Sequence, residues 1–196
     1  RILSSAASDV YKRQVMARAI TLFKIYSKNK FKPNEIHYEM NNDLQQTNPK
    51  GVYVTSIVGS YNSTTDVVEL SNAGHLPALF KNGNGFHEYE SSSLPLGVKK
   101  ADNSNDYKLE SFKLGNGRLY CFTDGFSECR NEKGEEIGIN GVKQLITSFQ
   151  NSSLKKELLK ITKDVEKKST KGQNFDQSNN QSNILEDDLT IIGLGK

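Results

Sequence analysis

Two acidic turns in this sequence each adjoin an apolar strand. Residues 119–125 (LYCFTDG) are typical of a buried strand that ends at Asp124 and then turns sharply at a glycine. Asp187 and Asp188 open a second apolar strand, residues 189–192. If the two strands are neighbours in one sheet, Asp124 and Asp187 converge on one point. Clustered carboxylates are tolerated there only when a cation neutralises them.

The chemistry that this pattern favours is a divalent-cation site. Oxygen ligands select hard ions such as Mg²⁺ or Mn²⁺, and such ions activate a water and neutralise a phosphate during hydrolysis. The predicted metal ligands and catalytic residues are therefore Asp124 and Asp187. Asp188 points to the opposite face of its strand, so we expect it to cap the strand or to orient a neighbouring group rather than to bind the metal. The structural alternative is one turn aspartate and one strand-opening aspartate without a shared ion.

Residues 72–75 (NAGH) interrupt a strand and supply a second candidate. His75 could act as acid, base or metal ligand, and the alternative is a loop histidine held by backbone hydrogen bonds. Asn72 tolerates left-handed geometry and can brace such a turn. Glu128 shares a face with Asp124 if a helical turn follows. It is then either a further acceptor near the site or a charge that favours a helix N-terminus.

Composition excludes several classes of protein. A chain of 196 residues with 35% apolar and 25% charged residues is expected to form one domain with one core. The net charge of +3 is small and dispersed, so nucleic-acid binding is not expected. No apolar run reaches the length of a membrane span. Cys121 and Cys129 lack a metal-binding spacing, and we expect reduced thiols in a cytoplasmic protein.

The first fourteen residues stand apart from the rest. Residues 1–14 (RILSSAASDVYKRQ) show no clear hydrophobic period, and we interpret them as a translated adapter or cloning scar rather than native sequence. Asp9 within them is followed by no glycine turn that would aim its carboxylate, so it is not counted as a ligand. The native domain is expected to span residues 15–196.

Helical patterns flank the domain. Amphipathic helices are predicted at residues 15–28, 33–44, 141–149 and 153–168, from apolar side chains spaced by three and four. The side chains expected to pack from the first two helices are Met16, Ala19, Ile20, Phe23, Ile25, Ile36, Met40 and Leu44. The lysines of the last helix are expected to face solvent.

Strand patterns fill the middle of the chain. The predicted strands are residues 52–58, 67–70, 77–80, 86–89, 107–114 and 119–122. Polar or Asn-Gly turns separate them, which favours antiparallel hairpins. We expect these hairpins to form a sheet with one buried face.

Five motifs occur in an order that belongs to one family. They are NAGHLP at 72–77, LG at 96–97, TDGFSE at 123–128, EIG at 136–138 and DDLT at 187–190. Together they resemble the SpoIIE-type, PP2C-like (PPM) serine/threonine phosphatases of bacteria, which include the stress-response regulators of anti-sigma-factor antagonists. Each motif alone is weak, whereas the ordered set is specific. The resemblance covers about residues 15–194.

The resemblance implies an α+β fold, a four-layer α-β-β-α sandwich of two antiparallel sheets covered by helices. It implies two Mn²⁺ or Mg²⁺ ions held by aspartates. The ions activate a water that attacks a phosphoserine or phosphothreonine on a partner protein, without a phosphoenzyme. By position, Asp124 and Asp187 resemble two of the ligands, and Asp188 falls where relatives often carry Asn. The implied partner is a phosphorylated signalling protein of the anti-sigma-factor-antagonist type, and sensor domains are common upstream.

The sequence departs from the family pattern in two places. The family's first strands have no counterpart before Val15. Its Asp-x-Ser-Gly turn is also missing there, and in the family this turn supplies the aspartate that bridges both metals. A Gly-Asp turn is replaced by Asn116-Gly117. We therefore expect a C-terminal part of the phosphatase domain, with roughly half of the metal site and little activity alone.

Two other readings remain open. The chain could be a non-catalytic module that uses a phosphatase-like fold to bind a signalling partner. It could also be a structural α+β domain with unrelated aspartates. The ordered motifs favour the phosphatase.

Overall fold

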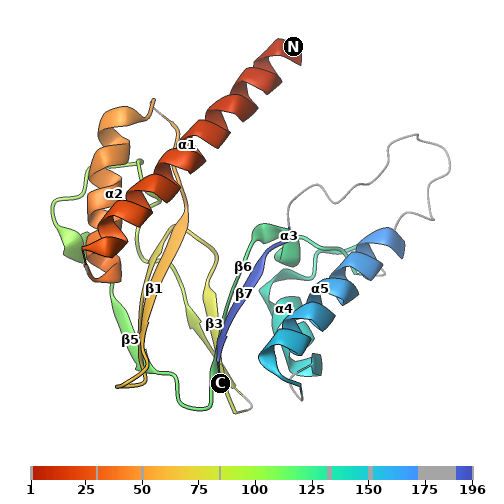
Figure 1. The fold of residues 1–196 in the computed structure, drawn as a ribbon. Helices are drawn as coiled ribbons and strands as arrows, with labels where there is room; N and C mark the ends of the chain where they lie inside the picture. The colour runs from red at the N-terminus through yellow and green to blue at the C-terminus, as the bar shows by residue number, and fades with distance from the viewer. Residues whose placement is uncertain are drawn as a thin grey trace. The chain divides into compact units, whose positions relative to one another are not determined.

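The computed structural model describes residues 2–29, 31–49, 51–83, 85–131, 134–149, 152–171 and 189–195. The chain divides into two compact units, and each is built from two separate stretches of sequence. The first unit comprises Arg1–Pro77 and Tyr89–Gly115, and the second comprises Ala78–Glu88 and Asn116–Lys196. Each combines helices with one antiparallel sheet (Figure 1).

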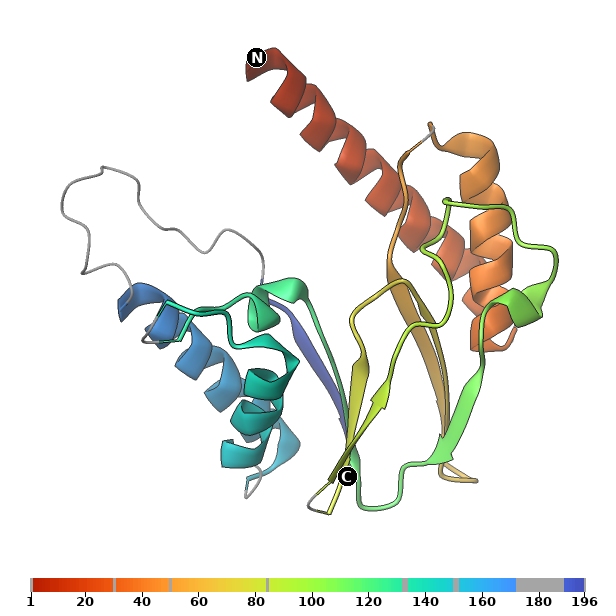
Figure 2. The ribbon, with the colours of Figure 1, turned by 180° about the vertical axis from the view of Figure 1, so that it is seen from behind.

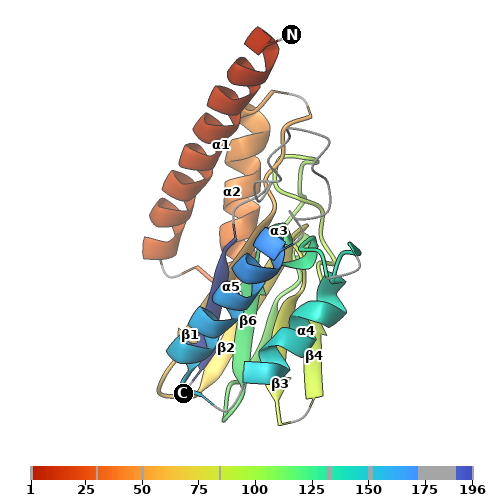
Figure 3. The same ribbon diagram turned by 90° about the vertical axis from the view of Figure 1, so that its right-hand side faces the viewer.

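Two helices open the first unit: α1 (Ile2–Lys28) and α2 (Pro33–Thr47). They lie side by side, as Figure 3 shows. Pro33 occupies the first turn of α2, where its missing N–H costs nothing, and Glu35 accepts a hydrogen bond from the Lys32 backbone N–H at 2.8 Å. Among the side chains that the structure describes, the buried apolar ones from the two helices are Val15, Ala19, Ile36, Met40 and Leu44.

The sheet of the first unit contains β1 (Ser56–Asn62), β2 (Val67–Ala73) and β5 (Glu110–Lys113), in the order β1-β2-β5. A four-residue turn joins β1 to β2, and both pairings are antiparallel. A 3-10 turn, η1 (Ser104–Asp106), precedes β5. The core between this sheet and α2 contains Val58, Ala73, Leu96 and Tyr107.

The sheet of the second unit contains β3 (Ala78–Asn82), β4 (Gly85–Tyr89), β6 (Arg118–Phe122) and β7 (Ile191–Gly195). Its order is β4-β3-β6-β7, so β6 lies between a strand that precedes it and the last strand of the chain. Figure 2 shows this sheet from behind. The hairpin of β3 and β4 follows the predicted Asn-Gly turn.

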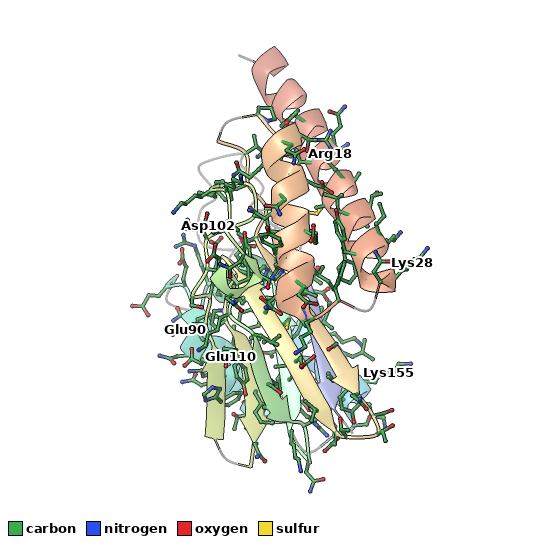
Figure 4. All side chains as sticks on the ribbon, turned by 90° about the vertical axis from the view of Figure 1, so that its left-hand side faces the viewer. Arg18, Lys28, Glu90, Asp102, Glu110 and Lys155 are labelled. Carbon is green, nitrogen blue, oxygen red and sulfur yellow. The ribbon has the colours of Figure 1, made fainter. Side chains whose placement is uncertain are left out.

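In the described residues, three helices follow β6: α3 (Asp124–Ser127), α4 (Gly138–Phe149) and α5 (Leu154–Lys171). α4 packs on α5, and α5 packs on β7 (Figure 3). Val142 and Ile146 on α4 and Ile161 and Val165 on α5 are fully buried, as their spacing predicts. The α5 lysines 155, 156, 160 and 163 are exposed, as expected, and Figure 4 labels the first of them.

The structure corrects the predicted first helix. α1 begins at Ile2 rather than at Val15, because residues 2–14 contain neither Gly nor Pro and are compatible with helix. Its packed face also differs from the prediction. Four side chains expected to be buried there are 40–54% exposed, namely Met16, Ile20, Phe23 and Ile25. The helix instead buries a neighbouring stripe that includes Val15 and Ala19.

The predicted strands also need correction. Val54 forms a single bridge with Leu96, and β1 begins only at Ser56. The predicted strand at 107–114 is shortened to β5, because η1 comes immediately before it. The described strands form two sheets, as the family resemblance implied, and not the one sheet expected from the strand pattern alone. In the described part of the chain, no helix is long and apolar enough to cross a bilayer.

Candidate active site

Asp124 lies where β6 ends and α3 begins. Tyr120 and Phe122 on β6 are buried, whereas Asp124 is exposed at the first position of α3. Asp124 Oδ1 accepts a hydrogen bond from the Gly125 N–H at 3.1 Å, and the Asp124 carbonyl accepts from the Glu128 N–H at 2.8 Å. The predicted strand with an acidic turn at its mouth is thus observed, and Asp124 faces solvent.

The second acidic strand adjoins the first. β7 pairs with β6 in antiparallel register over five residue pairs, from Arg118↔Gly195 to Phe122↔Ile191. One residue further, the Thr123 N–H donates to the Thr190 carbonyl at 3.0 Å, and the Thr190 N–H donates to Thr123 Oγ1 at 3.0 Å. The end of β6 that carries Asp124 therefore lies beside the start of β7. This adjacency is the condition on which the sequence-based site depends.

The structure describes only one of the two predicted site residues. Asp187 and Asp188 lie outside the described residues, so the convergence of Asp124 and Asp187 stays a prediction. Their sequence position is nevertheless informative, since Asp187 precedes Thr190 by three residues. Thr190 itself is hydrogen-bonded to Thr123, the residue before Asp124.

The described side chains offer the type of donor atom that a divalent cation needs, but too few of them. Asp124 offers exposed carboxylate oxygens, which are the donors that Mg²⁺ and Mn²⁺ prefer. Among the described residues, no Lys or Arg forms an ion pair with Asp124. Across these same residues, however, no three His, Cys, Asp or Glu side chains come together as a metal-binding group. The described residues therefore supply only one of the predicted ligands, Asp124, and an ion at this position would need more donors.

Cys121 lies on β6, three residues before Asp124. Burial raises the pKa of its thiol to about 11, so the thiol is protonated at neutral pH. A protonated thiol is a poor nucleophile. The chemistry available at this end of β6 is thus that of carboxylate oxygens rather than of a thiolate.

The NAGH turn in the first unit is held by the Asn72 side chain, as predicted. Asn72 Oδ1 accepts a hydrogen bond from the His75 N–H at 2.9 Å, and Asn72 Nδ2 donates to the carbonyls of His75 and Leu76 at 3.2 and 3.1 Å. The left-handed residue of the turn is Gly74, with φ of 71°. His75 Nδ1 lies 3.3 Å from the Leu76 carbonyl, which matches the loop-histidine alternative.

Glu128 is exposed and caps the C-terminus of α3, so the expectation that its charge favours a helix N-terminus is wrong. The predicted helical turn after Gly125 is present, and this turn was the condition for Glu128 to share a face with Asp124. The EIG motif folds back beside α3. The backbones of Arg130 and Glu136 pair in an isolated antiparallel β-bridge, and the Ile137 N–H donates to the Cys129 carbonyl at 2.9 Å. This motif therefore supports the segment that follows Asp124.

A cavity of about 300 Å³ lies elsewhere, in the first unit. It is bounded by α1, the start of α2, β1 and β2, and its lining includes Phe23, Phe31, Ile36 and Glu69. None of the predicted site residues lines it.

The sequence-based reasoning missed several buried polar groups, and two of them are fully buried titratable side chains. Glu157 on α5 is fully buried, forms an ion pair with Arg118 and accepts a hydrogen bond from the Tyr120 hydroxyl at 2.7 Å. His37 on α2 is also fully buried, and its Nδ1 lies 2.9 Å from Ser71 Oγ. Glu157 could have been recognised as a polar residue within an otherwise apolar helical stripe, whereas His37 lies between Asn34 and Asn41, which are buried as well.

Comparison with solved structures identifies the fold. The SiaA-PP2C domain of Pseudomonas aeruginosa matches with a TM-score of 0.71 at 14% identity, over 92% of this chain and 67% of that chain. The PP2C phosphatase domain of Bacillus subtilis SpoIIE, solved with a fragment of its regulatory domain, matches with a TM-score of 0.65 at 17% identity, over 89% and 47%.

A third structure contains the RsbU and RsbW domains of a Mycobacterium tuberculosis protein. It matches with a TM-score of 0.60 at 19% identity, over 78% of this chain and 41% of that chain. The chain thus spans less than half of the second and third structures. At these identities the matches show the fold alone, and they confirm the predicted α+β fold of the PP2C-like phosphatase type.

Sequence comparison assigns the family. No curated protein sequence matches the chain. The family model described as Stage II sporulation protein E (SpoIIE) matches residues 10–195, almost the whole chain. The chain belongs to the SpoIIE family, whose PP2C-type phosphatase domain it represents.

Proposed function

We propose that this protein is a metal-dependent protein serine/threonine phosphatase that acts in the cytoplasm. The observation that carries the proposal is the position of Asp124. In a SpoIIE-family chain, this exposed carboxylate stands at the end of β6, directly beside the start of β7. The motif DDLT leads into that same strand.

The proposed ligands for Mn²⁺ or Mg²⁺ are Asp124 and Asp187. An extended chain advances at most about 3.6 Å per residue, so three residues allow Asp187 a reach of about 11 Å from Thr190. Thr190 is hydrogen-bonded to the neighbour of Asp124. The bound ion would supply an acidified water and neutralise phosphate charge. Asp124 contributes a fixed oxygen donor, because the Gly125 N–H holds its Oδ1.

The proposed substrate is a phosphoserine or phosphothreonine on a bacterial signalling protein. An anti-sigma-factor antagonist is the partner class that the family resemblance favours. One structural relative contains RsbU and RsbW domains in a single protein, which supports a regulatory partner of this kind. The second candidate function is a non-catalytic module that binds such a partner. It is favoured by the small number of carboxylates that the described residues bring to the site.

The 196 residues alone are expected to bind Mn²⁺ weakly and to hydrolyse p-nitrophenyl phosphate very little. Uncatalysed phosphate-ester hydrolysis is among the slowest biological reactions, with enzymatic accelerations of up to about 10²¹. A partial ligand set therefore gives no practical rate. Robust Mn²⁺-dependent turnover by these residues would show that the site needs no further donors.

The decisive experiment uses the complete reading frame that contains this chain. We expect it to hydrolyse p-nitrophenyl phosphate and phosphoserine peptides with Mn²⁺, and we expect Asp124→Asn to reduce kcat at least about 100-fold. Asp102→Asn is the matched control, because it also converts an exposed aspartate, in the first unit, into asparagine and should retain activity. Retained activity in the Asp124→Asn variant would remove Asp124 from the site. Absence of hydrolysis in the unaltered protein would favour the binding module.

A further inference from the structure

The hydroxyl of Thr123 has an unusual role for a residue at a helix N-cap. Thr123 has an extended backbone (φ −81°, ψ 163°) and immediately precedes α3. A threonine in this position normally accepts a hydrogen bond from the first turn of its own helix. Thr123 makes no such side-chain bond. Its Oγ1 accepts instead from the Thr190 N–H, at 3.0 Å, on the neighbouring strand.

The backbone of Thr123 explains why the hydroxyl is needed. In a regular antiparallel pair, two residues exchange both N–H···O bonds. The Thr123 N–H does donate to the Thr190 carbonyl at 3.0 Å, but the Thr123 carbonyl accepts from the Phe126 N–H at 3.1 Å and starts α3. The side chain replaces the carbonyl that has turned into the helix. β6 can therefore bend at Asp124 while β7 stays in register for one more residue.

We propose that Thr123 is a positioning residue of the phosphatase site, and that its hydroxyl holds the start of β7 beside Asp124. This inference rests on the proposed function. Thr123 is not itself a ligand in this proposal, because its Oγ1 is directed to Thr190. It acts by fixing how the chain enters β7 relative to the carboxylate of Asp124.

The expected effect is local. Thr190 is exposed, so water competes for its N–H, and five backbone pairs between β6 and β7 remain without the side-chain bond. Loss of the hydroxyl should loosen the first residues of β7 without unfolding the sheet. Thr123→Val removes the acceptor and keeps the shape, whereas Thr123→Ser keeps the acceptor.

The first measurement is the rate of amide hydrogen exchange at Thr190. NMR monitors this exchange in the 196-residue chain and in both variants. We expect Thr123→Val to speed exchange of the Thr190 N–H about fivefold, the factor that one net hydrogen bond provides. Thr123→Ser should match the unaltered chain. The Cys121 amide, within the β6–β7 ladder, is the internal control and should be unchanged. Equal Thr190 exchange in all three proteins would overturn the proposed contact.

The second measurement is a Mn²⁺ titration read by paramagnetic broadening of the Gly125 amide signal, which detects weak binding without any activity. We expect Thr123→Val to need about fivefold more Mn²⁺ for half-broadening, and Thr123→Ser to behave as the unaltered chain. Faster Thr190 exchange with an unchanged Mn²⁺ requirement would overturn the positioning role.

Asp124→Asn separates this inference from the proposed function. We expect it to abolish local broadening at Gly125. If the unaltered chain and Asp124→Asn broaden equally, the proposed metal site is wrong and the positioning role fails with it. The exchange rate of the Thr190 N–H would then still test the hydrogen bond to Thr123 Oγ1, independently of any metal.

Discussion

Lys81 on β3 and Arg118 on β6 stand directly opposite each other in the antiparallel register. Like charges in opposed positions repel, and the Lys81 side chain is buried. Glu157 on α5 resolves the conflict, because its fully buried carboxylate forms an ion pair with Arg118 and accepts from the Tyr120 hydroxyl. Burial lowers the pKa of Lys81, and the Glu157 charge opposes that shift.

Glu157→Gln should destabilise the protein strongly. Removing one partner of a buried ion pair leaves an uncompensated charge and typically costs about 3–5 kcal/mol. Here Lys81 and Arg118 would lose their shared counter-charge. Urea unfolding followed by circular dichroism measures the change in the free energy of unfolding. Lys156→Gln, one residue earlier and exposed, is the control and should change it by less than about 0.5 kcal/mol. Equal stability of both variants would show that Glu157 is not the required counter-charge.

Stability should decrease in acid because of His37. Burial lowers the pKa of His37 from 6.5 to about 3, so between these values the unfolded chain binds the proton and the folded chain does not. The free energy of unfolding therefore rises with pH across this window, by at most about 1.4 kcal/mol per pH unit. The His37 share is fully present above pH 6.5 and is lost as pH falls toward 3.

Urea titrations at several pH values test this dependence. His37→Gln should flatten the slope below pH 6.5. Gln46→Ala replaces an exposed, uncharged side chain on the same helix and should leave the slope unchanged. A slope that survives in His37→Gln would assign the acid sensitivity to other groups.

Gly74→Ala should cost more stability than Gly83→Ala. Both glycines have positive φ, 71° and 59°, so an alanine at either site costs about 1–2 kcal/mol. A Cβ at position 74 would also come within 2.4 Å of Pro95 Cγ, whereas nothing lies within 4 Å at position 83. Overpacking adds about 1–3 kcal/mol. Thermal unfolding of the two variants gives the comparison, and an equal loss would show that the Asn72–His75 turn can shift away from Pro95.

Asn41→Ala should release the loop that contains the LG motif. Asn41 Oδ1 accepts from the Gly97 N–H at 2.8 Å, and Asn41 Nδ2 donates to the Lys99 carbonyl at 3.1 Å. Leaving these groups without partners costs about 2 kcal/mol. Trypsin should then cleave after Lys99 faster than in the unaltered chain. The exposed Gln46→Ala on the same helix is the control, and unchanged cleavage in Asn41→Ala would mean that the loop is held by other contacts.

Local patterns predicted the parts of the site that local chemistry determines. A strand of buried aromatics followed by Asp-Gly must turn at its end, and β6 does so at Asp124. Asn72 braces its turn because asparagine bonds readily to nearby backbone. The packed stripe of α2 followed from the regular spacing of Ile36, Met40 and Leu44.

Features that depend on residues far away in the sequence were not predicted. Apolar residues lie on more than one side of α1, so periodicity alone did not choose between the Val15 stripe and the Met16 stripe. Glu157 shares a stripe with Ile161, yet a carboxylate there is tolerated only because Arg118 and Tyr120 lie opposite. The bond from Thr190 to Thr123 required the register of β6 and β7, and the convergence of Asp124 with Asp187 stays a prediction.

The division of the chain has a consequence for synthesis on the ribosome. The hairpin of β3 and β4 leaves the ribosome well before β6, its neighbour in the sheet, and β7 emerges last of all. Residues 78–88 must therefore wait, with Leu79 and Phe80 uncovered, until about thirty further residues have been translated. Nascent chains of this protein should recruit chaperones during that interval, and no single cut of the gene can yield either unit as one continuous fragment.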